Sequence, residues 1–172
     1  ALRLEGGRLR FFTCKNGSEV TGTVTGATPV TLGVWHHVAG VYDGSRVYVY
    51  LDGVLDGSAS ATAGPGTGVA ETKIGSRGDS TGATRFTGLI DEVGLTAGVA
   101  YTGAFAAPLR LTVTPETRAL WTFDGRNGVD AASYRHDLQA LTAVTFSDDV
   151  PGGGGAPPPD QAPTGSVGVP SR

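Results

Sequence analysis

The 172-residue chain is poor in several kinds of residue, and each shortage excludes a class of protein. It has no methionine and one cysteine, Cys14, so it contains neither an internal disulfide nor a cysteine-based zinc site. We expect Cys14 to be a buried thiol. No apolar run approaches the about 20 residues that span a membrane. Charged residues are 17% of the chain, its net charge is −3, and it has no basic patch, which argues against a nucleic-acid partner.

What the chain does have is glycine, 28 residues of it, and short runs in which apolar and polar residues alternate. Two such runs between Trp35 and Gly53 are joined by Asp43-Gly44-Ser45 and end at Asp52-Gly53. This is the pattern of a β-hairpin that feeds another turn. Similar runs predict strands or hairpins over residues 1–13, 20–30, 54–62, 71–76, 86–95, 109–113, 118–123 and 138–146. One short helix is predicted within 131–141, and residues 101 and 105 are expected to pack onto the core.

The central hairpin predicts which side chains share a face. A three-residue loop, Asp43 to Ser45, pairs Tyr42 with Arg46 and Val41 with Val47. The face predicted to point inward holds Trp35, His37, Ala39, Val41, Val47, Val49 and Leu51. The face predicted to point outward holds His36, Val38, Tyr42, Tyr48, Tyr50 and Asp52.

The composition changes at Pro151. Residues 151–172 are rich in glycine and proline and cannot bury enough apolar surface to offset the entropy of ordering, so we expect a flexible linker after a domain over residues 1–150. The end of this linker resembles the entry to bacterial immunoglobulin-like repeats, which implies a further domain. Because the chain opens at Ala1 without methionine, we expect it to be a piece of a longer protein.

Two blocks of sequence carry a family resemblance. The first is WHHVAGVYDGSRVYVYLDG, residues 35–53, and the second runs from Ile74-Gly75 to FTGLIDEV, residues 86–93. Both resemble laminin-G-like modules of the concanavalin A-like lectin/glucanase superfamily, over about residues 8–96. The resemblance implies an all-β fold, a two-sheet antiparallel β-sandwich of the jelly-roll type, and an extracellular binding module.

A third block, LWTFDG at residues 120–125 followed by Gly128-Val129-Asp130, resembles the opening strand of such modules but stands late in the chain. Three explanations are open: a permuted strand order, the truncated start of a second copy, or a pattern shared by chance. Residues 1–112 alone would leave a sandwich with open edges, which are a liability. We therefore favour residues 113–149 closing the same sandwich.

The same superfamily includes glycosidases, which use two carboxylates that project into one cleft. Asp91 and Glu92 are adjacent, so on a strand they point to opposite faces and cannot form that pair. His36 and His37 also lie on opposite faces. We expect His36 to bond Asp52 across the hairpin and His37 to pack beside Trp35. The sequence therefore predicts no enzyme.

The resemblance also implies a structural calcium ion at the edge of the sandwich. Calcium takes oxygen ligands, and the matching residues are Asp124 and Asp130, with Asp91 or Glu92 from the second block. The alternative is that Asp124 begins a turn with Gly125 and that Asp130 caps a short helix.

Glycan binding needs aromatic rings for the apolar faces of sugars and polar groups for their hydroxyls. Tyr42, Tyr48 and Tyr50 share one face in the predicted register, with Arg46 or His36 placed to bond hydroxyls. The alternative is that these rings cover the second face of the sheet beneath a loop.

Together these features predict a non-catalytic binding module of a secreted, multidomain bacterial protein, located outside the cell or on its surface. Its expected partner is a carbohydrate, beside the neighbouring domains of its own chain. The alternatives are an adhesive spacer that binds extracellular proteins and an accessory domain of a glycoside hydrolase.

Overall fold

The computed structural model describes residues 1–15, 19–66, 72–76, 85–139, 144–147 and 151. Two units are present: residues 1–85 with 96–108, and residues 86–95 with 109–172. The described residues form strands and no helix, which confirms the predicted all-β class.

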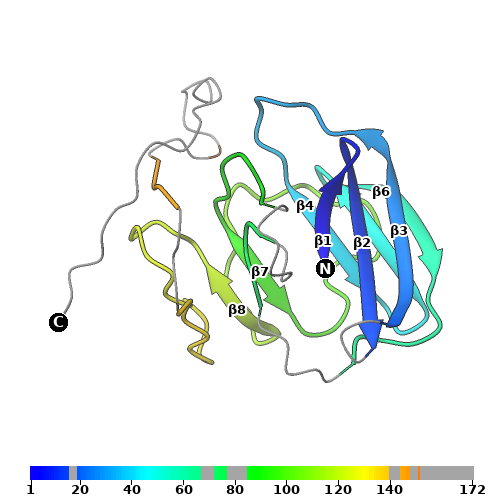
Figure 1. Cartoon of the computed structure of the whole chain (residues 1–172). Helices are drawn as coiled ribbons and strands as arrows, with labels where there is room; N and C mark the ends of the chain where they lie inside the picture. The colour runs from blue at the N-terminus through cyan, green and yellow to red at the C-terminus, as the bar shows by residue number, and fades with distance from the viewer. Residues whose placement is uncertain (16–18, 67–71, 77–84, 140–143, 148–150, 152–172) are drawn as a thin grey trace. The chain divides into compact units, whose positions relative to one another are not determined.

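The first unit begins with a three-stranded antiparallel sheet (Figure 1). Its strands are β1 (Leu2–Glu5), β2 (Arg8–Lys15) and β3 (Glu19–Pro29), in that order. Gly6 and Gly7, with φ of 57° and 73°, make the tight turn between β1 and β2, because glycine adopts positive φ without strain. The hairpin predicted over residues 1–13 and the strand predicted over 20–30 are both confirmed.

The second antiparallel sheet of this unit contains β4 (Val38–Tyr42), β5 (Arg46–Leu51) and β6 (Val54–Ser60). Leu51 pairs with Val54, so Asp52-Gly53 is a two-residue turn. Both turn residues have positive φ, 51° and 80°, as the turn type that matches the twist of a hairpin requires. The predicted turn at Asp52-Gly53 and the strand after it are confirmed.

The two sheets of the first unit pack against each other as two layers, blue and cyan in Figure 1. Side chains from both sheets meet between them. The buried members of this core are Leu9, Val24, Val47, Val49 and Leu51. This arrangement is a β-sandwich, as the sequence predicted.

The predicted register of the β4–β5 hairpin is wrong by one residue. Tyr42 pairs with Val47 and Val41 pairs with Tyr48. The connection is the two residues between Asp43 and Arg46, because the Asp43 N–H donates to the Arg46 carbonyl at 3.1 Å. Tyr42 therefore lies on the core side of the sheet.

The physical reason is that both faces of β5 are buried. A buried face opposite an exposed one specifies the register of a strand, and here that contrast is missing. Tyr50, on the face predicted to be open, is 2% exposed. It lies against Tyr101 and Phe105, whose stacked rings are 3.6 Å apart. Residues 101 and 105, expected to pack onto the core, pack instead on the opposite face of this sheet, against Tyr50. The alternative of rings beneath a loop holds for Tyr50.

The second unit contains β8 (Thr117–Trp121) and most of β7 (Val93–Thr96), which form a two-stranded sheet. Ala119, Leu120, Trp121 and Ala132 are buried. The strand predicted over residues 118–123 is confirmed with shifted ends, from 117 to 121.

Several predicted elements of the later chain are wrong. Residues 86–92 and 109–113 form no strand, and residues 131–139 form no helix. Gly88 has a φ of 152°, and the Leu111 N–H donates to the Glu92 carboxylate instead of to a neighbouring strand. Residues 93–95, the end of the predicted strand 86–95, do form a strand as part of β7. Near the predicted strand 71–76, Ser76 makes an isolated bridge to Arg85. Residue 71 of that predicted strand lies outside the described residues. In the predicted strand 138–146, residues 140–143 also lie outside the described residues, and residues 138–139 and 144–146 form no strand.

Candidate functional site

The connection between β4 and β5 is organised by one carboxylate, that of Asp43. Its Oδ1 accepts the N–H groups of Ser45 and Arg46, both at 2.8 Å, and its Oδ2 accepts the Tyr48 hydroxyl at 2.6 Å. Asp residues favour turns because they bond the backbone two residues ahead in this way. These donors, led by the Tyr48 hydroxyl, lower the pKa of Asp43, and the same bond raises the pKa of Tyr48.

Next to this turn, on the outer face of the β4–β5–β6 sheet, the side chains of Arg46 and Ser58 are also hydrogen-bonded to each other. Tyr48 pairs with Ser58, and Arg46 pairs with Ser60. Arg46 Nη2 donates to Ser58 Oγ at 3.0 Å. The side chains of Asp43, Arg46, Tyr48, Ser58 and Ser60 together are named the Tyr48 surface. It joins a half-buried aromatic ring, a carboxylate, a guanidinium and two hydroxyls.

The five residues predicted to bind a ligand do not lie together. Arg46 and Tyr48 belong to the Tyr48 surface. Tyr50 is buried, and Tyr42 faces the core with its hydroxyl donating to the Gly44 carbonyl at 2.7 Å. An exposed platform of three tyrosines is therefore wrong for two reasons: the register error places Tyr42 on the core side, and the rings of Tyr101 and Phe105 cover Tyr50.

The fifth residue, His36, holds the turn at the other end of the hairpin. Its Nδ1 lies 2.7 Å from Asp52 Oδ2, which confirms the predicted bond, and its Nε2 donates to the Thr31 carbonyl at 3.0 Å. Asp52 Oδ1 also accepts the His37 N–H at 2.9 Å. Both ring nitrogens of His36 are engaged by the fold and not presented to a ligand.

His37 packs, as predicted, but on the opposite side of the sheet from the core. Its ring meets Tyr101 and Phe105 edge-on, with centroids 6.0 and 5.4 Å away. Burial lowers the pKa of His37, and Asp52 opposes that shift. The imidazole is a packed aromatic ring in this unit.

Three of the four predicted calcium ligands gather in the second unit, around a guanidinium. Arg110 Nη1 lies 2.8 Å from both carboxylate oxygens of Asp124 and 3.4 Å from Glu92 Oε1. Glu92 also accepts the Leu111 N–H. Burial, and then the charge of Glu92, raises the pKa of Asp91, and Asp91 Oδ2 is buried without a hydrogen-bond partner among the described residues.

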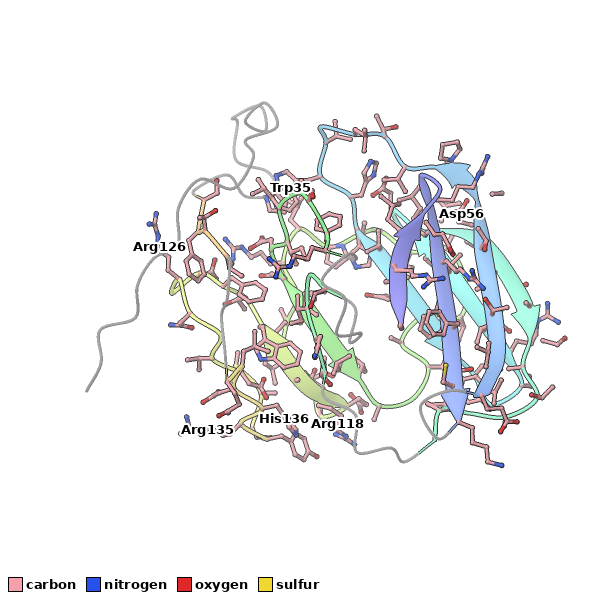
Figure 2. All side chains as sticks on the ribbon, viewed as in Figure 1. Trp35, Asp56, Arg118, Arg126, Arg135 and His136 are labelled. Carbon is pink, nitrogen blue, oxygen red and sulfur yellow. The ribbon has the colours of Figure 1, made fainter. Side chains whose placement is uncertain are left out.

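The fourth, Asp130, is used by the backbone. Its carboxylate accepts the N–H groups of Leu120, Ala132 and His136, each at 2.8 Å; His136 is labelled in Figure 2. Burial opposes ionisation, but these three donors hold the pKa of Asp130 below its usual value. Asp130 therefore ties the segment after β8 back to that strand.

These placements do not fit a calcium ion, which takes about six to eight oxygens. Within the described ranges no group of three or more His, Cys, Asp or Glu side chains is placed to hold a metal. A positive side chain, Arg110, already lies among Asp91, Glu92 and Asp124. Calcium binding stays a prediction from the sequence, and the described side chains do not support it.

Sequence reasoning missed Asp43 and Ser58 as members of a surface. Asp43 stands first in Asp-Gly-Ser, a turn signal that marks a carboxylate bonded to its own loop. Ser58 carries no such signal, because only the register of β5 and β6 brings it beside Tyr48.

In the described part of the chain no helix is long and apolar enough to cross a membrane.

A family model described as the concanavalin A-like lectin/glucanases superfamily matches residues 1–99. These residues include all six strands of the first unit. No curated protein and no solved structure matches the chain.

Proposed function

This chain belongs to the concanavalin A-like lectin/glucanase superfamily, and we propose that its first unit is a non-catalytic module that recognises carbohydrate. The Tyr48 surface is the observation that carries the proposal. An aromatic ring whose hydroxyl is fixed offers its face to the C–H side of a sugar ring. The carboxylate of Asp43 and the guanidinium of Arg46 flank it as an acceptor and a donor for neighbouring sugar hydroxyls.

Pre-organisation supports this role. Tyr48 is held by Asp43, and Arg46 is held by Ser58, so binding a sugar immobilises few further side-chain torsions. The surface lies on a sheet and not on a long loop, which fixes the spacing of its groups.

The chemistry of the carboxylates supports binding without catalysis. A glycosidase needs one carboxylic acid with a raised pKa near the scissile bond and a second carboxylate across from it. The pKa of Asp43 is lowered, so it stays ionised and acts as an acceptor. Asp91 has a raised pKa, but its neighbour Glu92 is bound to Arg110 and to the Leu111 backbone.

We also propose an extracellular or cell-surface location within a multidomain protein. The Gly/Pro-rich composition of residues 151–172 supports attachment to a further domain, since such segments separate domains in multidomain chains.

A glycan array tests the proposed function with the full chain, a Tyr48→Ala variant and a Tyr134→Ala control. Tyr134 is an exposed tyrosine of the second unit, so the control removes the same side chain elsewhere. We expect the parent and the control to bind the same glycans, and Tyr48→Ala to lose about tenfold or more in affinity. By circular dichroism Tyr134→Ala should melt like the parent, and Tyr48→Ala should unfold cooperatively at a somewhat lower temperature, because it loses a half-buried ring and the bond to Asp43. The array is therefore read at a temperature at which all three proteins are folded.

Two results would contradict the proposal. An array on which the parent chain binds no glycan favours a spacer that binds proteins. Glycan binding that Tyr48→Ala leaves unchanged places the site elsewhere. A Tyr48→Phe variant, which keeps the ring and loses the bond to Asp43, separates stacking from hydroxyl chemistry.

A further inference from the structure

The outer face of the β1–β2–β3 sheet carries a group of arginines that the Tyr48 surface does not use. Leu9 belongs to the core, so its neighbours on β2, Arg8 and Arg10, point outward. Arg3 pairs directly with Arg10, and Glu5 pairs with Arg8, which places all four side chains on one face. This group of Arg3, Glu5, Arg8 and Arg10 is named the arginine face.

Two of its guanidinium groups are held in place. Glu5 Oε2 accepts Arg10 Nη1 at 2.6 Å and Arg3 Nη2 at 3.0 Å. Arg10 Nε also donates to Thr23 Oγ1 at 3.2 Å, and the Arg3 guanidinium lies over the Phe12 ring, 5.2 Å from its centroid. Even so, the side chains of Arg3 and Arg10 remain 30% and 32% exposed. These groups are therefore ordered and still open to solvent.

The charge of this face is opposite to that of the whole chain. Three arginines and one glutamate leave it with two positive charges, whereas the chain carries a net charge of −3. The neighbouring residues of the face on β2 and β3 are Phe12, Thr23 and Thr25, all uncharged. The side chain of Arg8 makes no hydrogen bond or ion pair with another described residue, so its guanidinium is available to a ligand.

We propose that the arginine face binds a linear polysaccharide of uronic acid units through their carboxylates. Guanidinium groups pair with carboxylates through two parallel N–H donors, more specifically than ammonium groups do. Arg3 and Arg10 are spaced by one strand separation, about 4.8 Å, across the sheet, and Arg8 lies two residues from Arg10, about 6.8 Å along β2. A polymer with one carboxylate on each sugar offers successive carboxylates to this group of three guanidinium groups.

The form of the face favours a polysaccharide over an acidic protein. Protein interfaces have an apolar centre rich in exposed aromatic rings. The aromatic ring of this face, Phe12, is covered by Arg3. A charged surface whose aromatic ring is covered matches a polyanion that has no apolar side chains to bury.

The proposal goes beyond the Tyr48 surface, because a different sheet of the first unit carries it. Either surface can bind without the other. Variants at Tyr48 test neutral-sugar recognition, and variants at Arg8 and Glu5 test the polyanion, so failure of one proposal leaves the other intact.

The experiment is isothermal titration of the full chain with alginate, a uronic acid polymer, and with dextran, a neutral one. We expect binding to alginate that weakens as salt rises, because salt screens exposed charges, and no comparable binding to dextran at this face. Arg8→Gln should weaken alginate binding about fivefold, the effect of one exposed charged contact. Glu5→Gln should strengthen it by a similar factor, because it removes the competing carboxylate.

Arg126→Gln in the second unit is the matched control, since it changes the net charge by the same amount and should leave alginate affinity unchanged. Arg8→Gln breaks no described hydrogen bond, so its melting temperature should equal that of the parent chain. The proposal is overturned if alginate does not bind, if Arg126→Gln weakens binding as much as Arg8→Gln, or if Glu5→Gln lowers the affinity in a chain that still melts like the parent.

Discussion

At the residue scale, Arg110 pairs with acidic side chains that the family resemblance suggests as calcium ligands. Asp91, Glu92 and Asp124 match positions where the family resemblance implies calcium ligands. Arg110 Nη1 lies 2.8 Å from Asp124 Oδ1, so a positive side chain of the protein already offsets part of the negative charge of these three carboxylates. The acidic motif is present, and the fold has placed an arginine where a cation would be attracted.

This placement yields a prediction for Arg110→Gln. Loss of the guanidinium leaves three carboxylates close together, so the melting temperature of the variant should fall, because like charges repel. Calcium should raise the melting temperature of the variant more than that of the parent chain. Thermal melting in calcium and in EDTA measures both effects, with Arg135→Gln, a change at an exposed arginine of the same unit, as the control. A parent chain that calcium stabilises more than the variant would support the calcium prediction from the sequence instead.

Asp130, another of the residues that the resemblance suggests as calcium ligands, instead accepts hydrogen bonds from the backbone. The alternative of a capping residue came from its sequence position, and the structure shows the same chemistry, a carboxylate that accepts backbone N–H groups. The predicted helix is absent from residues 131–139, so Asp130 caps an irregular turn. The residue type predicted that the Asp130 carboxylate accepts backbone N–H groups. Which N–H groups these are depends on the tertiary structure, in which Trp121 forms a β-bridge with Asp130 and the Trp121 ring N–H donates to the His136 carbonyl.

At the element scale, the β4–β5 hairpin shows that alternation of apolar and polar residues predicts strands but does not fix their register. The two strands, the position of the turn between them and the following Asp52-Gly53 turn were predicted, whereas the turn between the strands has two residues and not the predicted three. The register was not, because Val41 and Tyr50 are buried on one face while Val47 and Val49 are buried on the other. The ring pair Tyr101–Phe105, about 50 residues away in sequence, covers that second face.

Gly40→Ala tests the observed register. Gly40 lies on the core side, where an added Cβ would be 2.3 Å from Phe11 Cδ2. We expect the variant to lose about 1–3 kcal/mol of unfolding free energy, because the core is overpacked. Chemical denaturation measures it. Gly103→Ala is the control, since nothing lies within 4 Å of its added Cβ. An unchanged Gly40→Ala would indicate that residue 40 faces solvent, as in the register predicted from the sequence.

At the scale of the whole molecule, the sequence leaves open whether residues 113–149 complete the sandwich formed by the earlier strands or begin a second copy of the module. The sequence predicts that they close the sandwich over residues 1–112. In the structure, residues from 109 onward belong to the second unit, together with residues 86–95.

A chain ending at residue 112 tests this prediction. If residues 113–149 close the sandwich, the shortened chain exposes sheet edges and apolar surface, and its thermal transition should become lower and less cooperative than that of the full chain. Near-ultraviolet circular dichroism, which reports on the packed Tyr50–Tyr101–Phe105 rings, follows the first unit specifically. An unchanged transition would favour the truncated start of a second copy.

The sequence by itself determined the fold class, the first six strands within a few residues, the positions of the two turns around β5 and the bond between His36 and Asp52. These depend on local alternation and on turn residues, which act over a few positions. The tertiary structure alone decided that Tyr50 is buried and that Arg110 meets Asp124, because these contacts join residues far apart in the chain and alternation within one strand carries no information about what packs on its two sides. It also decided that Tyr42 faces the core, through the length of the connection between β4 and β5. The shared face of Arg3, Arg8 and Arg10 follows from alternation in the local β1–β2 hairpin, and the structure adds that this face points away from the core.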